Sequence, residues 1–160
     1  MLFNSLQFLI FFPIVVALFF LLPQKRRWVL LLIASYYFYM CWKVEYIVLI
    51  IISTLIDYFV AQQMDKLQEK AKKKKWLYLS LMSNLGILFG FKYFNFINEN
   101  IQSFFDNFNI FYNITAFEVL LPVGISFYTF QTLSYTIDVY NGKTKAQKHL
   151  GVFAVFVSFF

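Results

Sequence analysis

The sequence is poor in the residues that soluble enzymes use for water contact and catalysis. Only 14% of its 160 residues are charged, and it has one cysteine, Cys41, and one histidine, His149. A single cysteine excludes a disulfide bond within the chain, and we expect Cys41 to behave as a small apolar side chain. We expect His149 to be a solvated loop residue, because no carboxylate is spaced to orient it as a general base.

Recognisable catalytic motifs are missing as well. With only 5 glycines, the sequence has no glycine-rich phosphate loop, and it has no metal-ligand cluster and no nucleophile elbow. We therefore predict no catalytic residue within this chain, no metal site and no bound cofactor.

Apolar and aromatic side chains are present in excess. Hydrophobic residues make up 61% of the chain and aromatic residues 23%, well above the average of soluble proteins. A packed globule could not hide this much apolar surface, so we expect a lipid bilayer around the chain. The net charge of +6 is clustered, which indicates orientation in a membrane and argues against a nucleic-acid partner.

The apolar runs predict an all-α, polytopic membrane protein with about five transmembrane helices, in a single portion over 1–160. About 20 helical residues match a hydrocarbon core of about 30 Å. The run Trp28–Ile56 is too long for one such helix, so we divide it near Cys41–Glu45, which leaves a short first arm that tilts, thins the bilayer or fails to span. The predicted spans are 3–22, 28–40, 44–62, 76–96 and 119–140, and 150–160 begins a sixth.

Two further patterns concern helix packing. Gly86 and Gly90 have the small-xxx-small spacing that lets a neighbouring helix approach closely. In 95–118, Asn, Gln and Asp side chains alternate with apolar ones at helical spacing. This pattern predicts a separate amphipathic helix lying on the membrane interface.

Basic residues fix the predicted orientation. Twelve of the fourteen lie within 25–27, 66–75 and 143–148. With the spans above, all twelve fall on one side, which the positive-inside rule makes cytoplasmic. We therefore place the loops 23–27, 65–75 and 143–148 in the cytoplasm, the N-terminus outside, and the protein in the plasma (inner) membrane.

The span 119–140 carries polar residues along one face. Their spacings of 4, 3, 4 and 3 keep them on one side of a helix, and lipid cannot satisfy such groups. We predict that this polar face lines a channel or site. Its residues are Gly124, Tyr128, Gln131, Tyr135 and Asp138.

Polar residues in other spans are further candidates. Ser53, Asp57 and Asn84 lie inside predicted helices, and an ionisable residue such as Asp57 is a functional candidate there. A hydrogen bond between helices near the inner interface explains Asp57 equally well. Asp138, close to its helix end, can equally well reach water.

Three stretches of the sequence are similar to one enzyme family. They are LFNSLQFLIFFPIVVALFFLLP at 2–23, SYYFYMCW at 35–42 and, above all, LPVGISFYTFQTLSYTIDVYNG at 121–142. Together they resemble the membrane-bound O-acyltransferases, in the bacterial branch of alginate O-acetyltransferases and D-alanyl transfer proteins.

The resemblance implies a multi-helix enzyme that takes an acyl group, acetyl or D-alanyl, from an activated donor on the cytoplasmic side. The donor is a substrate, either acyl-CoA or an acyl-carrier thioester. The acceptor is a hydroxyl of a cell-envelope or extracellular polymer.

The resemblance covers only the N-terminal third of such an enzyme. The family's catalytic histidine lies downstream, and His149 does not align with it, so we expect the 160 residues to be inactive alone. The implied partners are the lipid bilayer, the remaining C-terminal helices or a second chain, and an acyl-donor carrier protein. The alternative hypothesis is a small non-catalytic membrane protein, such as a transport subunit or an assembly factor.

Overall fold

The computed structural model describes residues 4–41, 44–106 and 124–159, and there the chain forms six helices and no strand. The all-α prediction is confirmed for these residues. The helices are α1 (Leu6–Leu21), α2 (Gln24–Met40), α3 (Glu45–Lys66), α4 (Lys70–Asp106), α5 (Ile125–Tyr140) and α6 (Leu150–Ser158). The predicted break in the long apolar run falls between α2 and α3.

Local sequence explains where the helices begin and end. The Ser5 hydroxyl accepts a hydrogen bond from the Phe8 N–H at 3.2 Å and caps α1. At the end of α5, Gly142 has a φ of 73°. Its N–H donates to Val139 O at 3.1 Å, and the Lys143 N–H donates to Asp138 O at 2.9 Å. These two bonds form a Schellman motif, which requires the left-handed conformation that glycine adopts freely.

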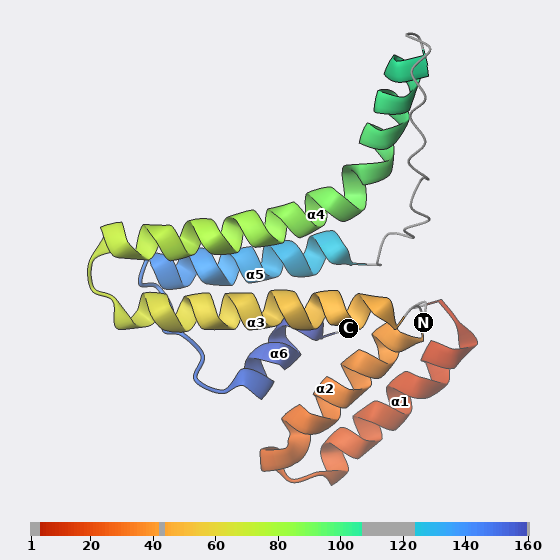
Figure 1. Cartoon of the computed structure of the whole chain (residues 1–160). Coiled ribbons are helices and arrows are strands. Elements are labelled where there is room, and N and C mark those ends of the chain that lie inside the picture. Colours follow the sequence, from red (N-terminus) through yellow and green to blue (C-terminus); the bar gives the residue numbers. More distant parts are fainter. Residues whose placement is uncertain (1–3, 42–43, 107–123, 160) are drawn as a thin grey trace.

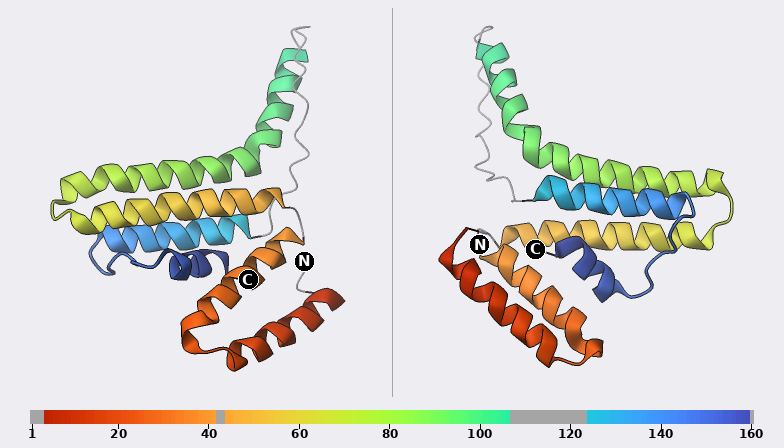
Figure 2. Two further views of the ribbon diagram at one scale, coloured as in Figure 1. Left: turned by 60° about the horizontal axis from the view of Figure 1, so that its bottom comes forward. Right: turned by 180° about the vertical axis from the view of Figure 1, so that it is seen from behind.

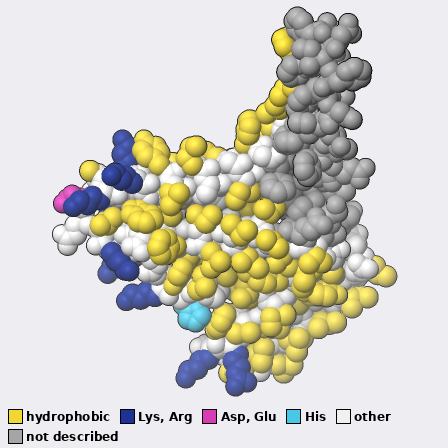
Figure 3. All heavy atoms as spheres, viewed as in Figure 1, with side chains coloured by type: hydrophobic (Ala, Val, Ile, Leu, Met, Phe, Trp, Pro, Cys, Tyr) yellow, Lys and Arg dark blue, Asp and Glu magenta, His cyan; other side chains and the backbone are white. Residues whose placement is uncertain are grey.

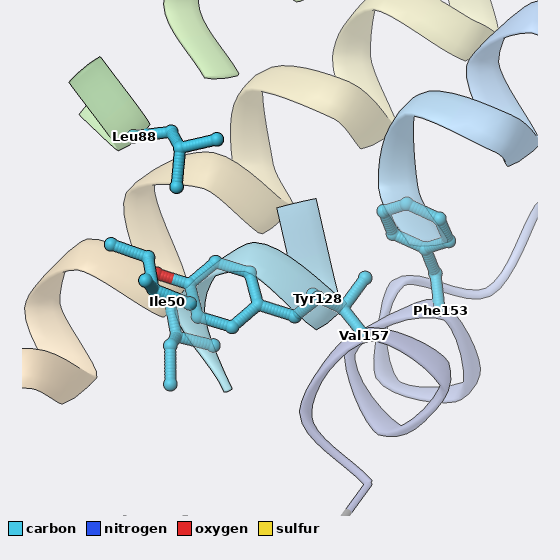
Figure 4. Close-up of a cluster of buried hydrophobic side chains, with 6 residues drawn as sticks. Ile50, Leu88, Tyr128, Phe153 and Val157 are labelled. Carbon is cyan, nitrogen blue, oxygen red and sulfur yellow. The ribbon is translucent and has the colours of Figure 1, made fainter. Parts of the chain in front are cut away.

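Helices α3, α4 and α5 lie side by side as a bundle (Figures 1 and 2). Two groups of buried side chains join them to α6 and its loop. In the first, Tyr128 of α5 extends its ring toward Ile50 of α3, with Leu88 of α4 beside them and Phe153 and Val157 of α6 behind (Figure 4). The second joins α3 to the other end of α5 and the following loop; its residues are Val60, Ala61, Met64, Val139 and Ala146.

Helices α1 and α2 form a hairpin beside this bundle (Figure 1). Arg27 secures the turn between them, because its Nε donates to Leu22 O at 3.1 Å and its guanidinium lies 4.7 Å from the centre of the Phe19 ring. Helix α2 packs against α6 at Gly151. A β-carbon at this position would overlap the ring of Trp28.

The molecular surface is largely apolar. Helix α1 buries only Val15, and large side chains such as Leu6, Phe20 and Leu21 are exposed. Lys and Arg side chains lie along the left and lower edges of the molecule, at the α3–α4 turn, the α5–α6 loop and the α1–α2 turn (Figure 3). An apolar surface with basic residues confined to the loops is typical of a protein that sits in lipid.

Among the described residues, one helix segment is long and apolar enough to cross a membrane. It is Ile47–Lys66. The most apolar stretch of this segment has a mean hydropathy of 1.8, and only 39% of that stretch is buried. A core helix of a soluble protein would be mostly buried. Helix α1 is apolar but shorter.

Helix α4 corrects one prediction. We predicted a span ending at residue 96 and a separate interfacial helix over 95–118. Instead, α4 runs without a break through 37 residues to Asp106, because no proline or glycine after Gly90 stops it. Residues 107–118 lie outside the described residues. At 1.5 Å per residue α4 is about 55 Å long, and its C-terminal part bends away from the bundle (Figure 1).

The close approach of α2 to α6 can be tested at Gly151. We expect Gly151→Ala to lower the free energy of unfolding by about 1–3 kcal/mol, because the new methyl group overpacks against Trp28. Thermal unfolding in detergent micelles measures this. The control is Gly86→Ala, also within a helix, where a β-carbon would meet nothing within 4 Å. Equal unfolding temperatures for both variants would contradict the contact.

Candidate functional site

A cluster of polar side chains lies buried where α3, α4 and α5 meet. At its centre is Asp57 of α3, which is 0% exposed. The Ser80 hydroxyl donates to Asp57 Oδ1 at 2.5 Å, and the Asn84 Nδ2 lies 2.8 and 2.9 Å from the two carboxylate oxygens. Ser80 and Asn84 are one turn apart on α4, so both face the same point on α3.

Two threonines of α5 complete this group. Thr132 Oγ1 lies 3.5 Å from Asn84 Oδ1, and Ser80 Oγ lies 3.5 Å from Thr136 Oγ1. Both hydroxyls also donate to carbonyls of their own helix, Thr132 to Thr129 O at 3.0 Å and Thr136 to Thr132 O at 2.9 Å. We call the five residues Asp57, Ser80, Asn84, Thr132 and Thr136 the Asp57 cluster.

Neutral groups surround the Asp57 carboxyl. Among the described residues, no cationic side chain lies within 4 Å of it. A buried carboxyl is costly unless hydrogen bonds satisfy it, and Ser80 and Asn84 supply these bonds. The geometry therefore supports the interpretation of Asp57 as a hydrogen-bonded link between helices.

The structure brings together two of the three polar residues that the sequence singled out in these helices. Asp57 and Asn84 do meet, but the buried Ser53 does not join them, since its hydroxyl donates to Ile50 O of its own helix at 3.1 Å. The threonines were missed. Thr129, Thr132 and Thr136 recur at spacings of 3 and 4 and are all buried, so their helical spacing was the available signal.

Two residues of the predicted polar face of α5, Gln131 and Tyr135, bind α6 and the loop before it, and the other three lie elsewhere. Tyr128 is buried in the first hydrophobic group. Gln131 donates through Nε2 to Phe156 O of α6 at 2.8 Å, which provides the partner that an amide within an apolar helix needs. Asp138, at the last turn of α5, lies 3.9 Å from Lys143 Nζ with 41% of its side chain exposed. Gly124 is exposed at the start of α5.

The loop between α5 and α6 is held by side chains from two helices. Gln62 Nε2 donates to Gln147 O at 3.0 Å and the Tyr58 hydroxyl donates to Lys148 O at 2.6 Å. The Gln147 N–H in turn donates to the Tyr135 oxygen at 2.8 Å. These bonds fix the backbone where α6 begins.

His149 is exposed, as expected of a loop residue, but it also has structural contacts. Its Nδ1 accepts a hydrogen bond from the Val152 N–H at 3.3 Å, which caps α6. Its ring lies edge-on to Trp28 with the ring centres 4.7 Å apart. No contact in the described residues arranges it as a general base.

A pocket of about 430 Å³ lies between α5, this loop and α6. Tyr135 is the one residue of the predicted polar face that lines this pocket. The remaining lining residues are Thr144, Lys145, Ala146, Gln147, Val152, Phe153 and Phe156. Within the described part of the chain, no group of three or more His, Cys, Asp and Glu side chains could hold a metal ion.

Comparison with known proteins identifies the relatives of this chain. A protein of Pseudomonas putida named probable alginate O-acetylase AlgI is 40% identical over 162 residues, covering 100% of this chain and 33% of that protein. The protein of the same name from Pseudomonas syringae pv. tomato is 41% identical, covering 100% of this chain and 31% of that protein. The chain is homologous to the alginate O-acetylases. This confirms the resemblance predicted from the sequence.

A second named activity appears among the relatives. A peptidoglycan O-acetyltransferase of Helicobacter pylori is 36% identical over 101 residues, which cover 62% of this chain and 18% of that protein. No protein-family model matches the chain, and no solved structure matches it significantly. The chain spans about a third of the length of the alginate O-acetylases that it matches.

The Asp57 cluster makes a testable prediction for stability. We expect Asp57→Ala to reduce the free energy of unfolding by about 2 kcal/mol, because it leaves the Ser80 and Asn84 side chains buried without their acceptor. Ser53→Ala is the matched control at a buried position of the same helix. We expect it to lose only about 0.5 kcal/mol, because the Ile50 carbonyl that Ser53 bonds keeps its hydrogen bond from Thr54 at 2.6 Å. Unfolding in mixed detergent micelles measures both. Equal losses of unfolding free energy in the two variants would contradict the role of Asp57 as a hydrogen-bonded link between helices.

Proposed function

We propose that this chain forms part of the membrane-embedded scaffold of an O-acyltransferase. The whole enzyme would transfer an acyl group, acetyl or D-alanyl, from a cytoplasmic activated donor to a hydroxyl of a cell-envelope or extracellular polymer. The observation that carries the proposal is the 40% identity to an alginate O-acetylase along the entire chain. The name of the Helicobacter pylori relative adds support for an acetyl group and an envelope polymer.

The proposed topology has α1 to α5 crossing the inner membrane, with the N-terminus outside. Its support is that the basic loops lie along the neighbouring left and lower edges of the molecule (Figure 3), and the positive-inside rule assigns such loops to the cytoplasm. Helix α6 begins directly after the basic loop 143–148. We propose that it enters the membrane from the basic side.

In this proposal the chain positions the acyl donor and the acceptor, and the general base comes from elsewhere. Among the described residues, the only histidine caps α6, and no side chain is arranged to take a proton from an acceptor hydroxyl. We propose that the base is the downstream histidine of the family, supplied by further helices or a second chain. The 160 residues alone would then be inactive.

The polar face of α5 has a structural task in this scheme. Gln131 and Tyr135 hold α6 and its loop against α5. The Asp57 cluster holds the other side of α5 against α3 and α4. The wall formed by α5 and α6 is therefore fixed on both sides, as a site that aligns two substrates requires.

A chimera tests the function. We replace the matching 162-residue region of the Pseudomonas putida relative with this chain and measure O-acetyl groups on alginate. We expect the chimera to retain acetyl transfer. Gln131→Ala in the chimera should lower transfer about tenfold, because α6 loses its hydrogen bond to α5.

The matched control is Ser134→Ala, an exposed position on the same helix, which should leave transfer unchanged. Membrane insertion of each chimera is measured by resistance to alkaline carbonate extraction, and its assembly by gel filtration in detergent. An inserted chimera without transfer would contradict the proposal. Normal transfer by the Gln131→Ala chimera together with altered assembly would favour the non-catalytic alternative.

A further inference from the structure

The pocket between α5 and α6 has a size suited to a small ligand. At about 430 Å³ it lies within the range of ligand sites, roughly 300–1,000 Å³. It is built from a fixed backbone, since Tyr58 and Gln62 of α3 hold the loop that forms one of its walls.

One part of the pocket offers hydrogen-bond donors without protein acceptors. The Tyr135 oxygen accepts from the Gln147 N–H, so its own O–H remains available to donate. Within the described part of the chain, the Thr144 hydroxyl and the Lys145 ammonium have no hydrogen-bond or ion-pair partner. Three residues with free donors, one of them charged, therefore line the same pocket.

Among the residues that the structure describes, no carboxylate lines the pocket to balance this charge. Asp138 lies nearby, but its closest cation is Lys143 at 3.9 Å. Asp65 lies near enough to act electrostatically on Tyr135, but it is exposed and outside the lining. Lys148 adds a further cation to the same loop. The donors and their surroundings therefore favour an anion.

Another part of the pocket is apolar. Val152, Phe153 and Phe156 of α6 form this wall, and Phe153 lies 4.9 Å from Tyr135 between ring centres. A simple inorganic anion would leave this wall uncovered. A ligand with an anionic head and an apolar chain satisfies both parts.

We propose that the pocket binds the phosphate head of an anionic phospholipid, with the start of its acyl chain along the α6 wall. The proposal rests on the proposed membrane placement, in which the basic loop lies at the cytoplasmic surface and α6 enters the hydrocarbon. Anionic phospholipids present phosphate at this boundary, where basic side chains attract them. The phosphopantetheine arm of a thioester donor, like a phospholipid, joins a phosphate to a less polar chain. The experiment therefore has to distinguish these two ligands.

The experiment uses the 160-residue chain in detergent micelles and fluorescently labelled phosphatidylglycerol as the probe. We expect saturable binding, with labelled phosphatidylcholine binding at least tenfold more weakly. Lys145→Ala should weaken phosphatidylglycerol binding about tenfold, because it removes the only cation among the described residues that line the pocket. Lys143→Ala is the matched control, since it removes the same charge from the same loop outside the lining, and its affinity should change less than twofold.

Three results would overturn the proposal. Equal losses for Lys145→Ala and Lys143→Ala would show attraction to a general basic surface, without a pocket. Equal affinity for the two lipids would show that the anionic head is not recognised. Displacement of phosphatidylglycerol by micromolar coenzyme A, but not by inorganic phosphate, would assign the pocket to the thioester donor. Because no acetyl transfer is measured, failure here is distinguishable from failure of the chimera.

Discussion

Hydrocarbon offers no hydrogen-bond partner, and this constraint accounts for the arrangement of α3, α4 and α5. A carboxyl on an apolar helix must find its donors on neighbouring helices, and Asp57 finds them in Ser80 and Asn84 at 2.5–2.9 Å. Thr132 and Thr136 extend the group to α5. Since apolar contacts between helices give little preference for one register in lipid, the polar contacts determine which faces meet.

The position of α5 then determines the rest of the candidate site. With its threonines directed toward α3 and α4, α5 presents Gln131 and Tyr135 to α6 and its loop. Tyr58 and Gln62 of α3 bind the same loop from the other side. The pocket that contains Lys145 therefore depends on the same bundle as the Asp57 cluster, although the two sites share no residue.

Sequence patterns predicted the helices better than their contacts. Apolar runs predicted an all-α chain, and the break near Cys41 follows from bilayer thickness together with the placement of the basic loops on one side. The continuity of α4 was missed. Its amphipathic part has the helical spacing of an interfacial helix, and the sequence does not show that residues 91–95 join this part to the preceding span as one helix. The threonine face of α5 was missed because threonine can satisfy its hydroxyl within its own helix, so its burial depends on neighbours that the sequence does not specify. Asp57 and Asn84 could be selected from the sequence as candidate site residues, because a carboxyl or an amide inside an apolar helix requires hydrogen-bond partners.

The account depends on the helices crossing a bilayer with all basic loops on one side, and labelling of α4 tests this most directly. In a Cys41→Ser background, Lys70→Cys and Asn100→Cys place single thiols at two exposed positions near opposite ends of α4. A membrane-impermeant thiol reagent is applied to intact spheroplasts and to permeabilised ones. The account predicts that Asn100→Cys is labelled in intact spheroplasts and Lys70→Cys only after permeabilisation. Labelling of both thiols from the same side would contradict it.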